Sequence, residues 1–402
     1  MSARRERLQD WDRRLVRIVG SVRLLSILSW DDSVRTHWQQ HGHLPAIELR
    51  VPELHAEREA LVALAGEIDT HDPLGRFLSE TARSYIDQID LLAAQGEPLF
   101  TALSKRLFGA PTDRVHPGAP SHLEAALHFL DVTAQLQIPD PPLDMDAHQA
   151  QDWLQRALAE FPDPLPVQVS KKISAKATAG SARIRLRHDA RFNVQILEQL
   201  LEHEAHVHSA TKRNGQDQPV LSAMGLSSPR TTRDQEGLAT FAELITDTMD
   251  HRRLRRVAVR VLAVQAALEG AGFAEVVELF RTHGQDEEEC YLSAARIFRG
   301  GAATGGVVFT KDCAYLAGLV RVHTFLVEAF RAGRMQLPRR LFAGRWTLGD
   351  ARDLEHAFEQ GLILEPARLP TWANRPGALA AHLAWAGFQN LGLLPGTMLE
   401  EL

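Results

Sequence analysis

The chain has 402 residues, of which 45% are apolar and 24% charged, with a net charge of −6 spread over both signs. These values are typical of soluble globular proteins, and the length allows one large enzyme or two to three domains. Because no broad basic excess and no unbroken apolar stretch of about 18 residues is evident, we expect neither nucleic-acid binding nor a membrane span.

The N-terminal part is predicted to be mostly helical. Leu15, Ile18, Val22 and Leu25 recur at helical spacing. Proline-rich breaks then interrupt the chain, and we place a domain boundary at the last of them, near residue 162. The sequence therefore predicts an N-terminal helical region (1–162) and a catalytic region (163–402). Further helices are expected at 58–68, 77–94 and 122–135.

The pattern changes after this boundary. Two strands are predicted at 167–173 and 182–188, with a small-residue turn at 179–181. In the second strand, Ile184 and Leu186 alternate with arginines. Such a basic face is typical of an edge strand, to which an extended acidic peptide can pair. The arginines are Arg183, Arg185 and Arg187.

Helices dominate the rest of the chain. Asn193 is the expected N-cap of a helix that continues through 203–208 and ends before Asn214. Further helices are predicted at 236–249 and 312–332, with a glycine-rich loop at 300–306 between them. The predicted fold class is therefore α+β, predominantly helical, with a small sheet.

The segment 201–209, LEHEAHVHS, gathers histidines and carboxylates. It lacks the short metal motif H-E-x-x-H, because position 207 is valine. On a regular helix His203 and His206 share one face, whereas His203 and His208 diverge by about 140°. These last two converge only if a π-bulge inserts a residue. Residue spacing alone thus favours His206 over His208 as the second metal ligand beside His203.

Six motifs together carry a resemblance to a known family. The chain resembles the QEGLA-motif family, whose bacterial members are labelled flavohemoglobin expression-modulating proteins and whose relatives are the microtubule-associated tyrosine carboxypeptidases. The resemblance runs from about residue 165 to near the C-terminus. The motifs are H-E-x-x-x-H (203–208), N-G-x-x-Q-P (214–219), Q-E-G-L-A (235–239), R-G-G (299–301), F-T-K-D (309–312) followed by Tyr315, and L-E-P-A-R-L-P-T-W (364–372).

The resemblance implies a zincin-like catalytic region and a Zn²⁺ cofactor. It implies His203, His208 and Glu236 as metal ligands and Glu204 as catalytic base; dipeptidyl peptidase III also uses an H-E-x-x-x-H helix. From the residues alone, Glu243 is a rival third ligand. With Asp247, it is otherwise expected to orient a ligand histidine.

Substrate contacts are also expected near the glycine-rich loop. A carboxypeptidase must bind a free α-carboxylate, for which arginine is best suited. We nominate Lys311 and Arg299, with Arg296 behind them. Tyr315 or His206 is the candidate donor to the oxyanion.

The resulting expectation is a zinc metallocarboxypeptidase acting on a peptide or protein C-terminus, with tyrosine as one candidate residue. The alternatives are an aminopeptidase or endopeptidase on the same zinc site, and a regulatory metal-binding protein. Cys290 and Cys313 cannot form a disulfide framework and no signal peptide is evident, so we expect a cytoplasmic protein. The natural substrate and the oligomeric state stay open.

Overall fold

The computed structural model describes residues 2–389 except 135, 137, 140, 160, 162, 172, 174, 175 and 181. The described chain is mostly helical with one three-stranded sheet, which confirms the predicted α+β class. The expected domain boundary falls at residue 162, outside the described residues. Residue 135, the predicted end of one helix, and residue 181, the last of the predicted turn, also lie outside them.

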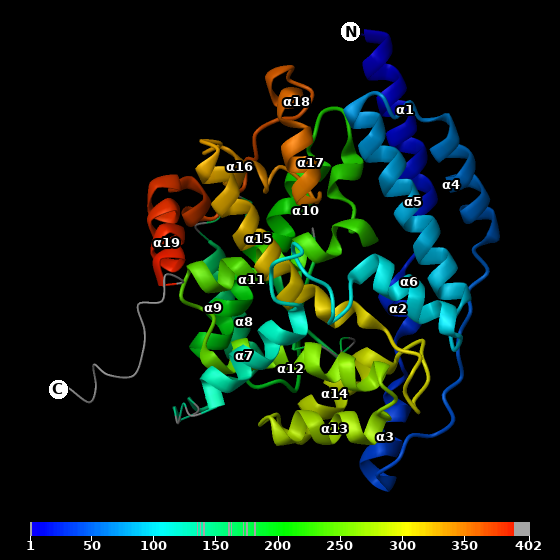
Figure 1. Ribbon diagram of the computed structural model, residues 1–402, viewed down its shortest axis with the longest axis vertical. Coiled ribbons are helices and arrows are strands. Elements are labelled where there is room, and N and C mark those ends of the chain that lie inside the picture. The colour runs from blue at the N-terminus through cyan, green and yellow to red at the C-terminus, as the bar shows by residue number, and fades with distance from the viewer. Residues whose placement is uncertain are drawn as a thin grey trace, which may run out of the picture.

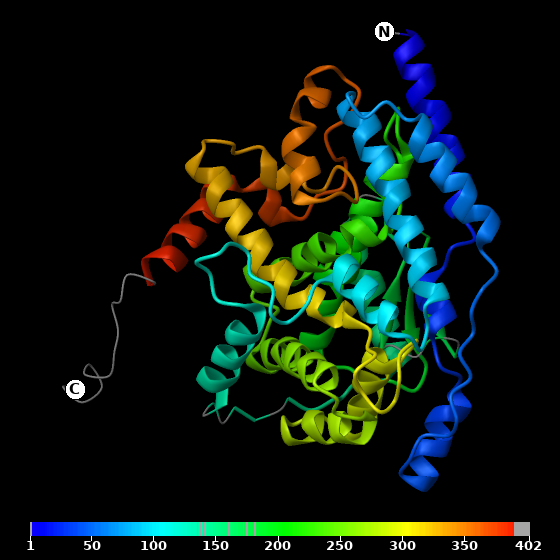
Figure 2. The same cartoon turned by 45° about the vertical axis from the view of Figure 1, so that its right-hand side comes forward.

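Long helices of the N-terminal part pack side by side along one flank (Figures 1 and 2). One of them starts at Pro73, where the Asp72 side chain accepts a hydrogen bond from the Leu74 amide. Its apolar face, including Phe77, is buried. The helices of this part are α1 (Ser2–Val19), α2 (Leu24–Leu28), α3 (Asp32–His41), α4 (His55–Glu67), α5 (Pro73–Ala93), α6 (Pro98–Phe108), α7 (His122–Ala134) and α8 (Ala147–Leu158).

The sheet corrects one prediction. Its order is β1-β3-β2, so β3 (Ile184–Arg187) is the central strand, paired in parallel with β1 (Val167–Ser170) and antiparallel with β2 (Ala177–Ala179). The expectation that the arginine-bearing strand is an edge open to a peptide is therefore wrong. Arg187 is instead buried and forms ion pairs with Asp189 and Glu288.

Two crossing helices, α11 (Thr232–Ile245) and α15 (Ala314–Arg331), form the centre of the molecule (Figure 2). They meet at Gly237 and Gly318, where a Cβ on Gly237 would lie 2.2 Å from the Gly318 carbonyl carbon. Contrary to expectation, Thr310–Arg331 is long and apolar enough to cross a membrane. However, 56% of its apolar window is buried inside the protein, as in a core helix.

One hydrophobic cluster joins the N-terminal helices to the rest: Leu8 and Phe77 share it with Phe241 and Phe342. The division into two regions stays a prediction. The other elements are α9 (Val194–Leu200), η1 (Leu201–Ser209), α10 (Ala210–Gln216), η2 (Ser222–Gly225), η3 (Pro229–Thr231), α12 (His251–Leu268), α13 (Phe273–Thr282), α14 (Glu287–Phe298), η4 (Thr310–Cys313), α16 (Leu337–Arg340), α17 (Leu348–Asp353), α18 (Glu355–Glu359), η5 (Thr371–Asn374) and α19 (Pro376–Gln389).

Candidate metal centre

The histidine segment is a π-helix. The element η1 joins α9 to α10, so the helix does not end before Asn214 as predicted but continues to Gln216. A π-helix carries more residues per turn than an α-helix. His203 and His208 therefore share a face, with ring centroids 4.8 Å apart and ring planes at 86°.

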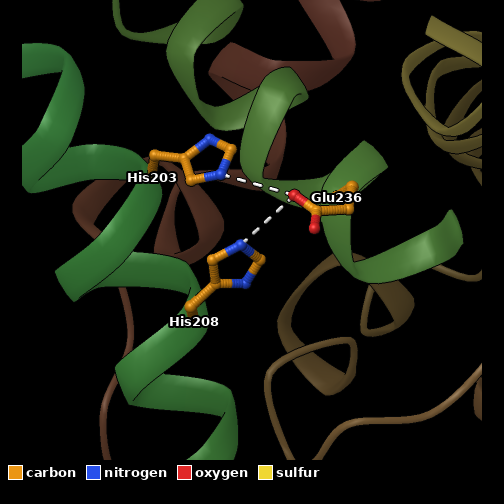
Figure 3. Close-up of side chains that lie close together, drawn as sticks. All are labelled: His203, His208 and Glu236. Atoms are coloured by element: carbon orange, nitrogen blue, oxygen red, sulfur yellow. Dashed lines mark ion pairs between the residues drawn. The ribbon is translucent and has the colours of Figure 1, made fainter. Parts of the chain in front are cut away.

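Three donors converge on one point (Figure 3). The Nε2 atoms of His203 and His208 each lie 3.6 Å from Glu236 Oε2. In the described part of the chain, these three residues are the one group of metal-binding side chains whose ligand atoms all lie within 4.8 Å of one another. Zinc bonds of about 2.0–2.2 Å in tetrahedral geometry place two ligand atoms about 3.4 Å apart. The residues present thus fit a zinc ion.

His206 does not join this group. Its ring stacks on Phe161 with centroids 4.8 Å apart, and its Nδ1 lies 3.0 Å from Glu202 Oε1. The preference for His206 from spacing assumed a regular helix and does not hold here. The role of His206 as an oxyanion donor stays a prediction.

A buried ion pair orients His203. Its Nδ1 donates to Glu243 Oε1 at 2.6 Å, and Glu243 also accepts from Arg253 Nε at 2.7 Å and Nη2 at 2.8 Å. Burial would raise the pKa of Glu243, but Arg253 and His203 lower it to about 2. An ionised Glu243 fixes the tautomer that leaves Nε2 of His203 free for a metal. Asp247 is exposed at the end of α11.

Lys311 orients the third donor. Its Nζ donates to Glu236 Oε1 at 2.8 Å, while the other carboxylate oxygen faces the histidines. Burial would raise the pKa of Glu236, but Lys311 and the two histidines hold it well below its usual range. To bind a substrate carboxylate, as predicted for it, Lys311 would therefore have to give up its ion pair with Glu236.

Glu204 lies on η1 next to His203 and is half-buried. Among the described residues, none forms a hydrogen bond or ion pair with its carboxylate, although its charge acts on His203 and His208. A carboxylate that is free and close to the three donors is suited to accept a proton.

Comparison with known proteins identifies a family. The family model described as "Microtubule-associated tyrosine carboxypeptidase" matches residues 37–390. The chain belongs to this family. No curated protein matches the chain. Membership in the tyrosine carboxypeptidase family makes the protein carboxypeptidase-like, and the match includes all three donors and Glu204.

Tyr315 lies beside the donors of this tyrosine carboxypeptidase family member. Its ring is nearly parallel to that of His203, with centroids 6.4 Å apart. Arg296 Nη2 donates to the Tyr315 hydroxyl oxygen at 3.1 Å and also pairs with Asp312. Arg296 is therefore engaged, whereas the Arg299 guanidinium lies 5.1 Å from the centroid of the Phe309 ring.

The glycine-rich loop packs against the protein itself. A Cβ on Gly300 would lie 2.7 Å from side-chain atoms of Leu28 and Phe100. On Gly301, it would lie 2.1 Å from the Val307 carbonyl oxygen. These glycines are thus required by internal packing, and the expected approach of a ligand is not needed to explain them.

Sequence reasoning missed two basic residues of the site. Arg253 belongs to the basic segment 251–256 (HRRLRR), a pattern typical of a solvated helix face, yet it is 8% exposed. Arg345 was not singled out, although its Nη2 donates to the His208 carbonyl oxygen at 2.9 Å. The motif N-G-x-x-Q-P (214–219) could have pointed to this region. The side chains of Asn214 and Gln218 donate hydrogen bonds to the carbonyl oxygens of Phe342 and Ala343, which lie close to Arg345 in the sequence.

Proposed function

We propose that this chain is a zinc-dependent carboxypeptidase, with a zincin-like catalytic region, that removes one C-terminal residue from a peptide or protein. The observation that carries the proposal is the convergence of His203, His208 and Glu236 beside the free carboxylate of Glu204. Family membership supports the reaction class. Tyrosine is the first C-terminal residue to test, and the cytoplasm is the proposed location.

Each side chain has a role in this reaction. A zinc ion held by the three donors would lower the pKa of a bound water toward about 7 and polarise the scissile carbonyl. Glu204 accepts the proton of the attacking water and returns it to the leaving amine. Tyr315 accepts a hydrogen bond from Arg296, so its own hydroxyl proton is available to the developing oxyanion.

The alternatives are less well supported. A structural zinc is bound by four protein ligands, and in the described chain only three donors gather. A purely regulatory metal site also needs no free carboxylate like that of Glu204. An aminopeptidase needs a further acidic group for the substrate amine besides the proposed base Glu204. A carboxypeptidase instead needs a cation for the substrate carboxylate, and Arg345, which contacts the His208 carbonyl oxygen, has no carboxylate partner among the described residues.

The test is mass spectrometry of peptides that differ in their C-terminal residue. We expect loss of one C-terminal residue by the wild-type protein, none with a chelator, and at least a 100-fold slower reaction for Glu204→Gln. Glu202→Gln is the matched control, because Glu202 lies on the same helix but contacts His206. Equal turnover of Glu204→Gln and wild type would refute the assigned base, and internal cleavage would identify an endopeptidase.

A further inference from the structure

Two cations beside η1 have no acidic partner. Arg345 lies between α16 and α17, and Lys212 lies on α10; both are partly buried. In the described part of the chain, neither forms an ion pair with a carboxylate. Burial lowers the pKa of both groups, because desolvation disfavours their charged forms.

Arg345 retains unused hydrogen-bonding capacity. Its Nη2 donates to the His208 carbonyl oxygen at 2.9 Å and its Nη1 donates to Ser227. Its Nε is covered and has no hydrogen-bond partner in the described structure. A guanidinium has five N–H donors, so Nη1 and Nη2 of Arg345 each retain one N–H without a partner among the described residues.

Three other basic groups near the donors are already paired with carboxylates, whereas the guanidinium of Arg299 lies over the Phe309 ring. Lys311 binds Glu236 and Arg253 binds Glu243. Arg296 binds Asp312 through Nε and Nη2. Within the described structure, Arg345 therefore contacts the metal-site helix directly and lacks a carboxylate partner. Tyr85 on α5 is also buried, and its charge interacts with that of Arg345.

We propose that Arg345, assisted by Lys212, binds the α-carboxylate of the peptide substrate. This inference rests on the proposed function and replaces the nominated Lys311 and Arg299 as the carboxylate contacts. A planar guanidinium binds both oxygens of a carboxylate. Because Arg345 contacts the backbone of His208, a carboxylate held there would place the terminal peptide bond next to the three donors. The carboxylate of an acidic side chain in the substrate could bind the same guanidinium, so the test must distinguish it from the α-carboxylate.

The test measures binding, so that it does not depend on turnover. Zinc-loaded Glu204→Gln protein is titrated by calorimetry with a tyrosine-ended peptide as the free acid and as the C-terminal amide. We expect the acid to bind more tightly, and Arg345→Met to weaken acid binding about 10- to 100-fold while leaving amide binding unchanged. Lys212→Met should reduce the preference for the free acid over the amide by a smaller factor, and the substitution lies on α10, outside η1. A peptide without acidic side chains should keep the full preference.

Three results would overturn the inference. These are equal binding of acid and amide by the unsubstituted site, an unchanged preference in Arg345→Met with zinc still bound, and a preference that follows an acidic side chain. Arg213→Met is the matched control, because Arg213 lies on α10 next to Lys212 but pairs with Asp163, and it should bind both peptides like the parent. A failure of the proposed function would appear separately, as absence of cleavage by wild-type protein in the mass-spectrometric assay.

Discussion

His203 and His208 are separated by four residues, yet their rings lie 4.8 Å apart and nearly perpendicular. The cause is the π-helical geometry of η1, which places the second histidine where a regular α-helix would not. His206, which a regular helix would favour, instead stacks on Phe161. The local winding of one helix thus decides which histidine faces Glu236.

Zinc content distinguishes the two histidines. His208→Ala should lose most of the bound zinc, because one of three donors is removed. His206→Ala should keep about one zinc per chain, since its side chain stacks on Phe161 and pairs with Glu202 and is not one of the three gathered donors. Elemental analysis of both purified variants checks this. Loss of zinc from His206→Ala alone would contradict the proposed ligand set.

The Arg253–Glu243 pair should control zinc affinity without contacting the ion. Arg253→Met removes the group that keeps Glu243 ionised against His203, and we expect about 10- to 100-fold weaker zinc binding. Arg256→Met is the control, because Arg256 lies on the same helix but faces Glu289 at 3.8 Å. Competition with a chromogenic chelator measures both affinities. Equal affinities would mean that Glu243 does not orient the ligand.

The close crossing of α11 and α15 should not tolerate a side chain. In Gly237→Ala the new Cβ would lie 2.2 Å from the Gly318 carbonyl carbon, so the helices must separate at a cost of about 1–3 kcal/mol or more. Zinc binding should weaken too, because Glu236 is the adjacent residue. Gly66→Ala, on exposed α4 with nothing within 4 Å, should instead be neutral or stabilising. Thermal unfolding compares the two, and equal melting temperatures would contradict the packing argument.

The buried Asp312 should make stability depend on pH. Burial would raise its pKa, but Arg296 and Arg260 lower it from 3.8 to about 2. Folding therefore disfavours its protonated form, and the stability it contributes is full above pH 3.8 and is lost as the pH falls toward 2. We expect Asp312→Asn to be less stable than wild type at pH 7. The difference should shrink as the pH falls below 3.8, by about 1 kcal/mol at pH 3 and by on the order of 2 kcal/mol in total below pH 2.

Urea unfolding of both chains at pH 7 and pH 3, without metal, measures that difference. The surface residue Asp353, which pairs with Arg352, provides the control: Asp353→Asn should follow the acid dependence of wild type. A constant gap between Asp312→Asn and wild type across this pH range would show that Asp312 is not held ionised by the arginines.

Much of the fold followed from local sequence patterns. Helical spacing located α4, α5 and α15 to within a few residues, and Asn193 caps α9 through the Ile196 amide as predicted. The resemblance singled out His203, His208 and Glu236, which the structure brings together. Glu243 was the rival ligand or orienting residue, and its contact with His203 favours the second role.

The remainder depended on contacts distant in sequence. The edge position assigned to β3 failed because β2 was not recognised and pairs with its second side. Arg253 and Arg345 were missed because an arginine is normally solvated, and only the fold places Glu243 and His208 against them. A π-bulge was recognised as necessary for His208 to bind a metal together with His203. Residue spacing alone, however, could not show that the helix adopts this bulge.

The most direct test is the zinc content of the purified wild-type protein, followed by removal and return of the metal in the peptide assay. We predict one zinc per chain, loss of C-terminal cleavage with a chelator, and recovery of cleavage when zinc is added. We also predict that Glu236→Gln binds far less zinc, because it loses the carboxylate that faces both histidines. A protein that binds no zinc, or that cleaves equally well without it, would contradict the account.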